Sequence, residues 1–267
     1  EYRGKGDEIL IGFESDNETE YFYDEYIRVY GATDETPAPV PGGSGGGGLI
    51  IPPQETKENV TTSTDIATSK KTTSTTVKDI KTETVKNEAG QSVSKTTASI
   101  SKETAEKLVG QAVSNKVDTV EINVESNNTG KSNGEKSTEL EIPKTAVDSI
   151  ANNTDAGMVI KTGAGQIALD NKSLGAIASA TGSDTVRIVI NENTQLAESQ
   201  KQAENVIGSN GTIFDVAAYI GNTRVYDLKD GSADVMLPVP EKLKGKDIAV
   251  ISISDKGICE VLNHSME

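Results

Sequence analysis

The sequence predicts an α+β fold: antiparallel strand-strand-helix units, followed by a β-sandwich-like C-terminal part, with a separate N-terminal β-hairpin. Three observations predict it. Short segments alternate apolar and polar residues, as half-buried strands do. Three segments between residues 101 and 182 instead place apolar residues at helical spacing. The 267 residues are 34% hydrophobic and 4% aromatic, without Trp, so we expect an aliphatic core and some extended or solvated chain.

Residues 1–36 are expected to form the C-terminal hairpin of a truncated Ig-like β domain. The stretches EILIGF and EYIRVYGA are rich in β-branched and aromatic residues and predict two strands, and the polar ESDNETE predicts the loop between them. Because two strands alone are marginally stable in water, we expect the earlier strands of this domain to lie upstream of Glu1, in a longer protein.

Residues 37–54 are predicted to be a linker. Prolines stiffen its first half and glycines loosen its second half, as in PAPVPGGSGGGG. The Thr- and Ser-rich residues 55–91 follow and predict an extended stalk or a hairpin, because threonine favours extended backbone. A turn is expected at VKNEAGQSV, around Gly90. For residues 52–75, a disordered tract is the alternative.

Residues 92–192 are predicted to be an α+β module with units of about 35–40 residues, a spacing that suggests internal repeats. Ser101 is the expected N-cap of the first helix, with Glu103 in its first turn. Pro143 opens the second helix, and Asp170 caps a third that ends at Gly182. The apolar residues expected on one face of the first helix are Ala105, Leu108, Val109, Ala112 and Val113. The inward residues expected in the strands are Val120, Ile122, Val124, Leu140 and Ile142.

Residues 193–267 are predicted to be a β-rich module. The stretches GTIFDVAAYI and TRVYDL flank Gly221 and Asn222, which predict a hairpin turn. Further strands are expected in SADVMLPVP, DIAVISIS and ICEVL. No helical pattern interrupts them, so this segment is expected to be β-sandwich-like.

The net charge of −15 argues against nucleic acid and against anionic lipid surfaces as partners. The longest apolar run is far shorter than the roughly 20 residues of a membrane-spanning helix, so no direct membrane insertion is expected. The single cysteine, Cys259, is expected to be a small buried hydrophobic residue.

The aromatic cluster Tyr21, Phe22, Tyr23 and Tyr26 is the candidate ligand-binding site, because aromatic rings stack on sugars. Packing against upstream strands is the competing interpretation. We expect no catalytic residues and no cofactor. A weak structural calcium site stays open, since DLKDGSAD supplies the carboxylates of Asp227, Asp230 and Asp234.

Other candidate chemistry is weaker. The glycine-containing TGAGQ and GKGDE lack the Lys-Ser/Thr of a phosphate-binding loop. Paired carboxylates such as Glu121 with Glu125, and Glu139 with Glu141, are expected to be solvated surface rather than acid–base groups. His264 beside Ser265 raises the idea of self-cleavage, but a frayed chain end is the preferred interpretation.

The stretch LPVPEKLKGKDIAVISISDKGICEVL resembles the β-rich module that precedes the anchoring S-layer homology repeats of Gram-positive bacterial surface-layer proteins. The stretch from Ile142 to Ala178 is similar to the neighbouring helix-hairpin-helix segment, and YRGKGDEILIGFESD with the Gly-rich run resembles the Ig-like tail and linker. The motifs are turn glycines, prolines and strand alternation.

This resemblance implies a secreted protein of the bacterial cell surface or cell wall, in which the chain is a non-enzymatic structural or spacer module. Its partners would be other domains of the same surface protein. The first alternative is an adhesion module that binds a cell-wall polysaccharide or a host or matrix protein. The second is an autoproteolytic or hydrolytic cell-surface domain.

Overall fold

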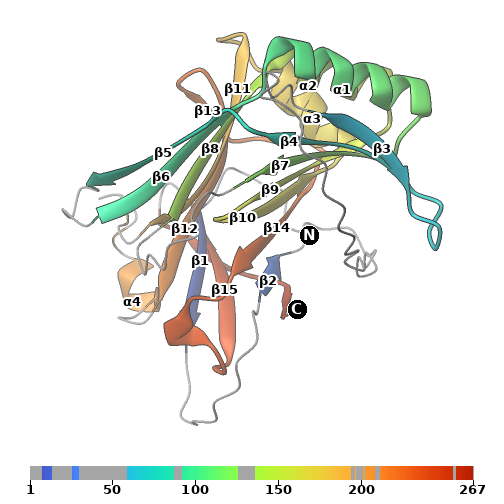
Figure 1. Ribbon diagram of the computed structural model, residues 1–267. Helices are drawn as coiled ribbons and strands as arrows, with labels where there is room; N and C mark the ends of the chain where they lie inside the picture. The colour runs from blue at the N-terminus through green and yellow to red at the C-terminus, as the bar shows by residue number, and fades with distance from the viewer. Residues whose placement is uncertain are drawn as a thin grey trace, which may run out of the picture.

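The computed structural model describes residues 8–13, 26–29, 59–86, 92–125, 136–193, 196, 201, 203–207, 211–254 and 257–266. Two sheets and four α-helices make up the described fold (Figure 1), so the predicted α+β class is confirmed. None of these helices is long and apolar enough to cross a membrane.

Sheet 1 contains nine strands. Their order is β16 (Cys259–Leu262), β15 (Ile248–Ile253), β1 (Glu8–Phe13), β12 (Thr212–Ile220), β11 (Thr185–Asn193), β8 (Lys136–Pro143), β6 (Ser92–Ser99) and β5 (Ile80–Lys86), with β13 (Thr223–Val225) also paired to β12.

Sheet 2 contains eight strands. Their order is β17 (His264–Met266), β2 (Tyr26–Val29), β14 (Ala233–Pro238), β10 (Gly165–Leu169), β9 (Gly157–Thr162), β7 (Thr119–Val124), β4 (Lys71–Val77) and β3 (Val60–Thr64).

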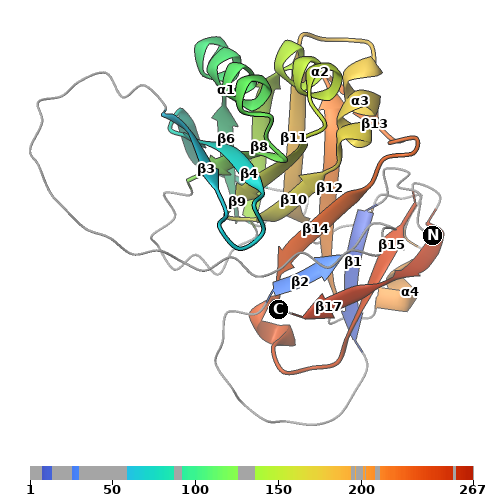
Figure 2. The same cartoon turned by 90° about the vertical axis from the view of Figure 1, so that its right-hand side faces the viewer.

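Three helices carry the chain from one sheet to the other. They are α1 (Lys102–Asn115) from β6 to β7, α2 (Lys144–Asn153) from β8 to β9, and α3 (Asn171–Ser179) from β10 to β11. All three lie side by side at one end of the strands (Figures 1 and 2). The short α4 (Glu204–Ile207) lies near β1, and a 3₁₀ turn spans Glu241–Leu243.

The prediction of antiparallel strand-strand-helix units holds for β9, β10 and α3 but not throughout, because three strand pairs are parallel: β4 with β7, β7 with β9, and β6 with β8. The cause lies in the helices. Since α1 and α2 leave sheet 1 and enter sheet 2 at the same end, successive strands of one sheet run in the same direction. The helices do not cover a face of one sheet but connect the two sheets.

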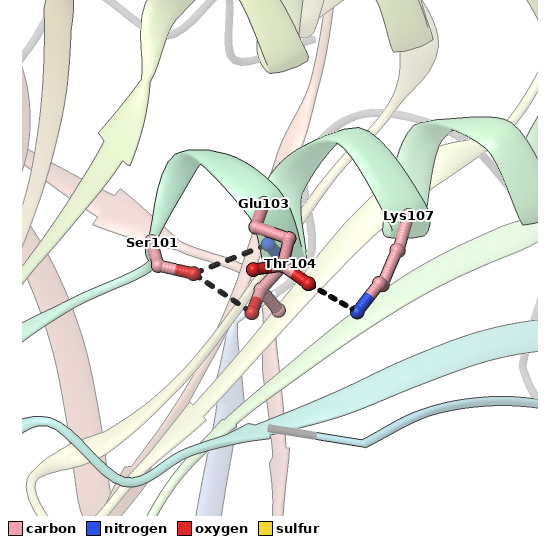
Figure 3. A network of polar contacts seen from close by, with 4 residues as sticks. All are labelled: Ser101, Glu103, Thr104 and Lys107. Atoms are coloured by element: carbon pink, nitrogen blue, oxygen red, sulfur yellow. Dashed lines mark hydrogen bonds and ion pairs between the residues drawn. The ribbon is translucent and has the colours of Figure 1, made fainter. Parts of the chain in front are cut away.

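The predicted helix starts are confirmed. The Ser101 Oγ accepts a hydrogen bond from the Thr104 N–H at 3.1 Å, and its hydroxyl donates to Thr104 Oγ1 at 2.9 Å. One turn on, Lys107 Nζ lies 2.8 Å from Glu103 Oε1 (Figure 3). At the third helix the Asp170 carboxylate accepts from the Ser173 N–H at 2.7 Å. These caps satisfy amide groups that helix ends otherwise leave unpaired.

Side chains of both sheets and of the three bridging helices enter one core. All five predicted inward strand residues are buried there: Val120, Ile122, Val124, Leu140 and Ile142. On α1, Ala105, Leu108 and Ala112 are buried. Val113 is 40% exposed, however, so the predicted apolar face was too wide. The turn at Gly221 also forms as predicted, and a second tight hairpin joins β9 to β10 at residues 163–165.

The Thr-rich segment contributes to both sheets. Strands β3 and β4 form a hairpin, and Thr73 and Thr75 of β4 are buried in the fold. The Thr62 hydroxyl donates to Gln111 Oε1 at 2.9 Å, which fixes β3 against α1. Strands β5 and β6 pair as antiparallel neighbours, in line with a turn between them, although residues 87–91 lie outside the described ranges. So does the predicted linker at residues 37–54.

The separate N-terminal hairpin is wrong, because β1 and β2 join different sheets. Strand β1 lies between β12 and β15 in sheet 1, whereas β2 lies between β14 and β17 in sheet 2 (Figure 2). Their pairing partners come from the other end of the chain, which local sequence patterns do not specify. Strand β11 pairs with β12 across the expected boundary at residue 192, so both expected modules share sheet 1.

Candidate functional site

The outer face of sheet 1 carries a line of charged and aromatic side chains, which we call the arginine–tyrosine row. Its members, in order across five strands and the residue after β13, are Lys95, Glu139, Arg187, Tyr219, Asp215, Arg224 and Tyr226. Strand alternation positions them. Val186 and Ile188 are buried in the core on either side of Arg187, so the Arg187 side chain leaves the opposite face of the sheet.

Glu139 joins three strands at the start of the row. Its Oε1 lies 2.9 Å from Lys95 Nζ on β6, and its Oε2 lies 3.6 Å from Arg187 Nη1 on β11. The Glu139 side chain is only 17% exposed. The carboxylate is therefore a shared partner of two cations, and the prediction that it is simply solvated surface is wrong.

Arg187 and Tyr219 are direct cross-strand partners on β11 and β12. The guanidinium carbon lies 4.8 Å from the centre of the Tyr219 ring, the geometry of a cation–π contact. Burial, and secondly the negative charge of Asp215, raise the pKa of the Tyr219 hydroxyl. The phenol therefore stays neutral at physiological pH and beyond.

The second half of the row repeats this arrangement. Arg224 on β13 lies 3.0 Å from the Asp215 carboxylate on β12, with both side chains largely buried. Its guanidinium also lies 5.6 Å from the centre of the Tyr226 ring, which is 47% exposed. Tyr226 is thus the solvent-facing end of the row, with Arg224 beside its ring.

This geometry ties neighbouring strands together. Each charged side chain of the row contacts an opposite charge or an aromatic ring on a neighbouring strand, or on the residue that follows β13. Cross-strand pairs of this kind stabilise a sheet by about 0.2–1 kcal/mol each. Sheet 2 has a shorter equivalent, in which Lys161 Nζ lies 2.6 Å from Glu121 Oε2 and the Asn123 amide donates to Glu121 Oε1 at 3.0 Å. Both faces therefore use carboxylates as cross-strand contacts.

The predicted aromatic site is not among the described side chains. Tyr21, Phe22 and Tyr23 lie outside the described residues, and only the backbone of Tyr26, in β2, is described. The predicted acidic cluster of Asp227, Asp230 and Asp234 does not form a metal-binding group in the described structure. The Asp227 carboxylate accepts from the Lys229 N–H at 2.7 Å, and the described residues contain no group of three or more His, Cys, Asp or Glu arranged to hold a metal ion.

The end of the chain is a strand rather than the frayed segment that we expected. His264 and Ser265 lie in β17, which pairs with β2. The His264 ring nitrogens face backbone carbonyls, with Nε2 2.8 Å from the oxygen of Ile248 and Nδ1 3.3 Å from that of Leu262. Cys259 was expected to be buried but is only partly buried; it packs against a small apolar cluster, and burial raises the pKa of its thiol.

A sequence pattern that indicates the arginine–tyrosine row is visible but was not used in the sequence analysis above. In TVRIVI, DVAAYI and TRVYDL, an arginine or tyrosine occupies an outward position of a strand that is otherwise apolar. Such residues indicate an outer face with its own contacts. Which strands are neighbours, and hence which charges meet, is set by the topology. Comparison of the chain with protein-family models, curated proteins and solved structures gives no match.

Proposed function

We propose that this chain is a non-enzymatic structural module of a secreted bacterial cell-surface protein, one that transmits load between neighbouring domains of the same protein. The single observation that supports this most is the pairing of the two ends of the chain within the sheets. Strand β1 pairs antiparallel with β15, and β2 pairs antiparallel with β17. A force along the chain therefore acts on strand ladders before it reaches the core.

Two further features support a mechanical role. The arginine–tyrosine row ties β6, β8, β11, β12 and β13 together on the outer face of sheet 1. The core that the bridging helices close is built mainly of aliphatic side chains. In this proposal, residues 193–267 act as a β-sandwich-like part, and the module needs no cofactor.

Single-molecule stretching of the full chain between two handle domains tests this proposal. We expect a cooperative unfolding event at a force well above that of an unstructured chain. Leu10→Pro, in the centre of β1, should lower that force, because proline removes a donor from a strand that is paired on both sides. Ser44→Pro, in the Pro/Gly-rich segment, is the matched control and should leave it unchanged. Extension of the wild-type chain without a force peak would overturn the proposal.

The surface location has a separate test. If the protein is displayed outside the cell, a membrane-impermeant lysine reagent applied to intact cells labels it. The net charge of −15 suits a soluble exported module. Labelling only after lysis would exclude the cell-surface assignment and leave the mechanical role to be judged by stretching.

A second candidate, an adhesion module for a polysaccharide or for a host or matrix protein, has one specific observation in its favour. Tyr226 exposes nearly half of its surface, and the Arg224 guanidinium lies 5.6 Å from the centre of its ring. A positioned aromatic face is a suitable stacking surface for a sugar ring. Binding on a glycan array that Tyr226→Ala abolishes and Tyr226→Phe retains would favour adhesion over a purely mechanical role.

A further inference from the structure

The two N-terminal strands occupy interior positions in both sheets, although they are distant in sequence from every strand that they pair with. Leu10 of β1 pairs with Ile213 on one side and with Ile251 on the other. Arg28 of β2 pairs with Met236 and with Ser265. Without these strands, β12, β15, β14 and β17 would each expose an unpaired ladder edge. Open edges of this kind are filled by pairing with another strand.

The connection between these strands and the rest of the fold is long. Thirty residues, 30–59, separate Val29 at the end of β2 from Val60 at the start of β3. In sheet 2 these strands are six positions apart, with β14, β10, β9, β7 and β4 between them. At about 4.8 Å per position this is a span of roughly 30 Å. Thirty residues reach about 100 Å when extended, so the tether is much longer than the span requires.

We propose that β1 and β2 are exchanged between copies of this chain, so that β1 of one copy enters between β12 and β15 of a second copy, and β2 between its β14 and β17. In the exchanged dimer, β1 and β2 of each molecule take the places that β1 and β2 of the other molecule occupy in the monomer. All backbone pairings of these two strands are then kept, but they form between the two molecules. This assembly does not depend on the mechanical role proposed above.

Concentration decides between closure within one chain and exchange between two. A tether with the Pro/Gly-rich composition of PAPVPGGSGGGG gives the attached strands an effective concentration in the mM range. Closure within the chain therefore dominates in dilute solution, whereas exchange becomes competitive when copies are crowded to a similar concentration. Exchange becomes the sole route to the paired fold when the tether is too short to reach.

The first experiment shortens the tether. Deletion of residues 34–57 leaves six residues between Val29 and Val60, which reach at most about 25 Å, less than the span of roughly 30 Å. We expect size-exclusion chromatography with light scattering to show a folded dimer or a larger oligomer. The matched control replaces residues 34–57 with an equally long Gly/Ser sequence and should be a monomer in dilute solution. A folded monomer of the deletion variant would overturn the proposal.

The second experiment uses the full-length chain and reports pairing directly. Gly12 of β1 and Ala249 of β15 are cross-strand partners, a separation that a disulfide can span. Gly12→Cys and Ala249→Cys are placed on different chains, each also carrying Cys259→Ser. The two are refolded together from urea at about 10 μM and at about 1 mM, then oxidised. We expect a disulfide-linked heterodimer that rises at least tenfold in fraction at the higher concentration.

The control for this mixture is Gly12→Cys with Val261→Cys. Val261 lies on exposed β16, the strand beyond β15, and so it is not a neighbour of Gly12 in the paired fold. A heterodimer in the Ala249 mixture but not in the Val261 mixture supports exchange. Equal yields in both, or no heterodimer at either concentration, overturn it. This mixture is decisive on its own, because it needs no shortened chain.

Discussion

The molecule combines two regions that are built in different ways. The helical region, residues 59–193, contains β3 to β11 and the three bridging helices, and its chain passes back and forth between the sheets in sequence order. The terminal region comprises residues 8–13, 26–29, 203–207, 211–254 and 257–266. There, strands from the two ends of the chain are interleaved in both sheets.

The two regions also differ in how they are packed. The helical region supplies most of the continuous core, including Ile122, Leu140 and Ile160. The terminal region adds a second, smaller apolar cluster made of Ala203, Ile207, Ile213, Ile251 and Ile253, partly beneath α4. The first region is held mainly by local connections and by the large core, to which Phe214 and Leu237 of the terminal region also contribute, whereas the second region depends on long-range pairing. Loop-closure entropy opposes such pairing until both ends are in place.

The largest expected effect comes from truncating one core isoleucine in each region. Ile160 in the large core and Ile253 in the small cluster are both fully buried. Ile→Ala substitutions cost about 2–5 kcal/mol, depending on how far the site can collapse. We expect Ile160→Ala near the top of that range and Ile253→Ala near the bottom, because the small cluster has few neighbours to hold a cavity open. Urea unfolding of both variants measures the difference.

Hydrogen exchange sharpens the same comparison. Ile253→Ala should speed amide exchange in β1 and β15 more than in β7 and β9, since the terminal region opens separately when weakened. Uniform acceleration throughout the chain would contradict the division into two regions and indicate a single cooperative unit.

The second-largest expected loss of stability comes from a substitution at the contact between the terminal region and the helical region. Gly231, in the loop before β14, lies against the start of α3, and a Cβ there would overlap the backbone nitrogen of Ser173. Beside it, the Ser173 hydroxyl donates to the Ser232 carbonyl at 2.8 Å, and the Ser232 hydroxyl donates to Asp170 at 3.1 Å. Gly231→Ala must displace this loop, and we expect a loss of about 1–3 kcal/mol in the free energy of unfolding.

The matched control is a glycine within α3 itself. A Cβ on Gly175 would meet nothing within 4 Å. Gly175→Ala should therefore stabilise the fold by roughly 0.5–1 kcal/mol, through better helix propensity. Thermal unfolding of the pair separates close packing from glycine flexibility. Equal effects of the two substitutions would show that the contact between loop and helix does not hold the regions together.

The contrast between regions also explains what the sequence could predict. In the helical region each element follows from its own residues: the Ser101 and Asp170 caps, and the alternation that buries Val120, Ile122 and Val124. In the terminal region the strand at residues 8–13 was recognised, but its partners were not. Pairing of Leu10 with Ile251 joins residues far apart in the chain, and no local pattern encodes it.

The candidate row was missed for a related reason. Arg187 and Tyr219 are each visible as outward polar or aromatic residues, yet their contact exists only because β11 and β12 are neighbours. The parallel pairs were missed because strand alternation gives burial but not direction. Direction follows from the helices that bridge the sheets, and only the three-dimensional arrangement reveals it.

The smallest expected effect concerns Tyr219, which lies in the row where strands of the two regions meet. Its pKa is raised above 10.0 in the folded protein, by burial and secondly by Asp215. Below pH 10.0 the phenol is neutral in both the folded and the unfolded chain, so it leaves stability independent of pH. As pH rises past the unfolded pKa, the unfolded chain loses this proton more readily than the folded chain. Stability therefore falls between the unfolded and the folded pKa.

Tyr219→Phe removes this source of alkaline destabilisation and keeps a ring beneath Arg187. We expect wild type and variant to differ little at neutral pH, and the variant to lose less stability as pH rises through 10.0. Urea midpoints measured across that range provide the check. A constant offset between the two proteins at all pH values would contradict a raised pKa of the half-buried Tyr219 hydroxyl in the folded protein.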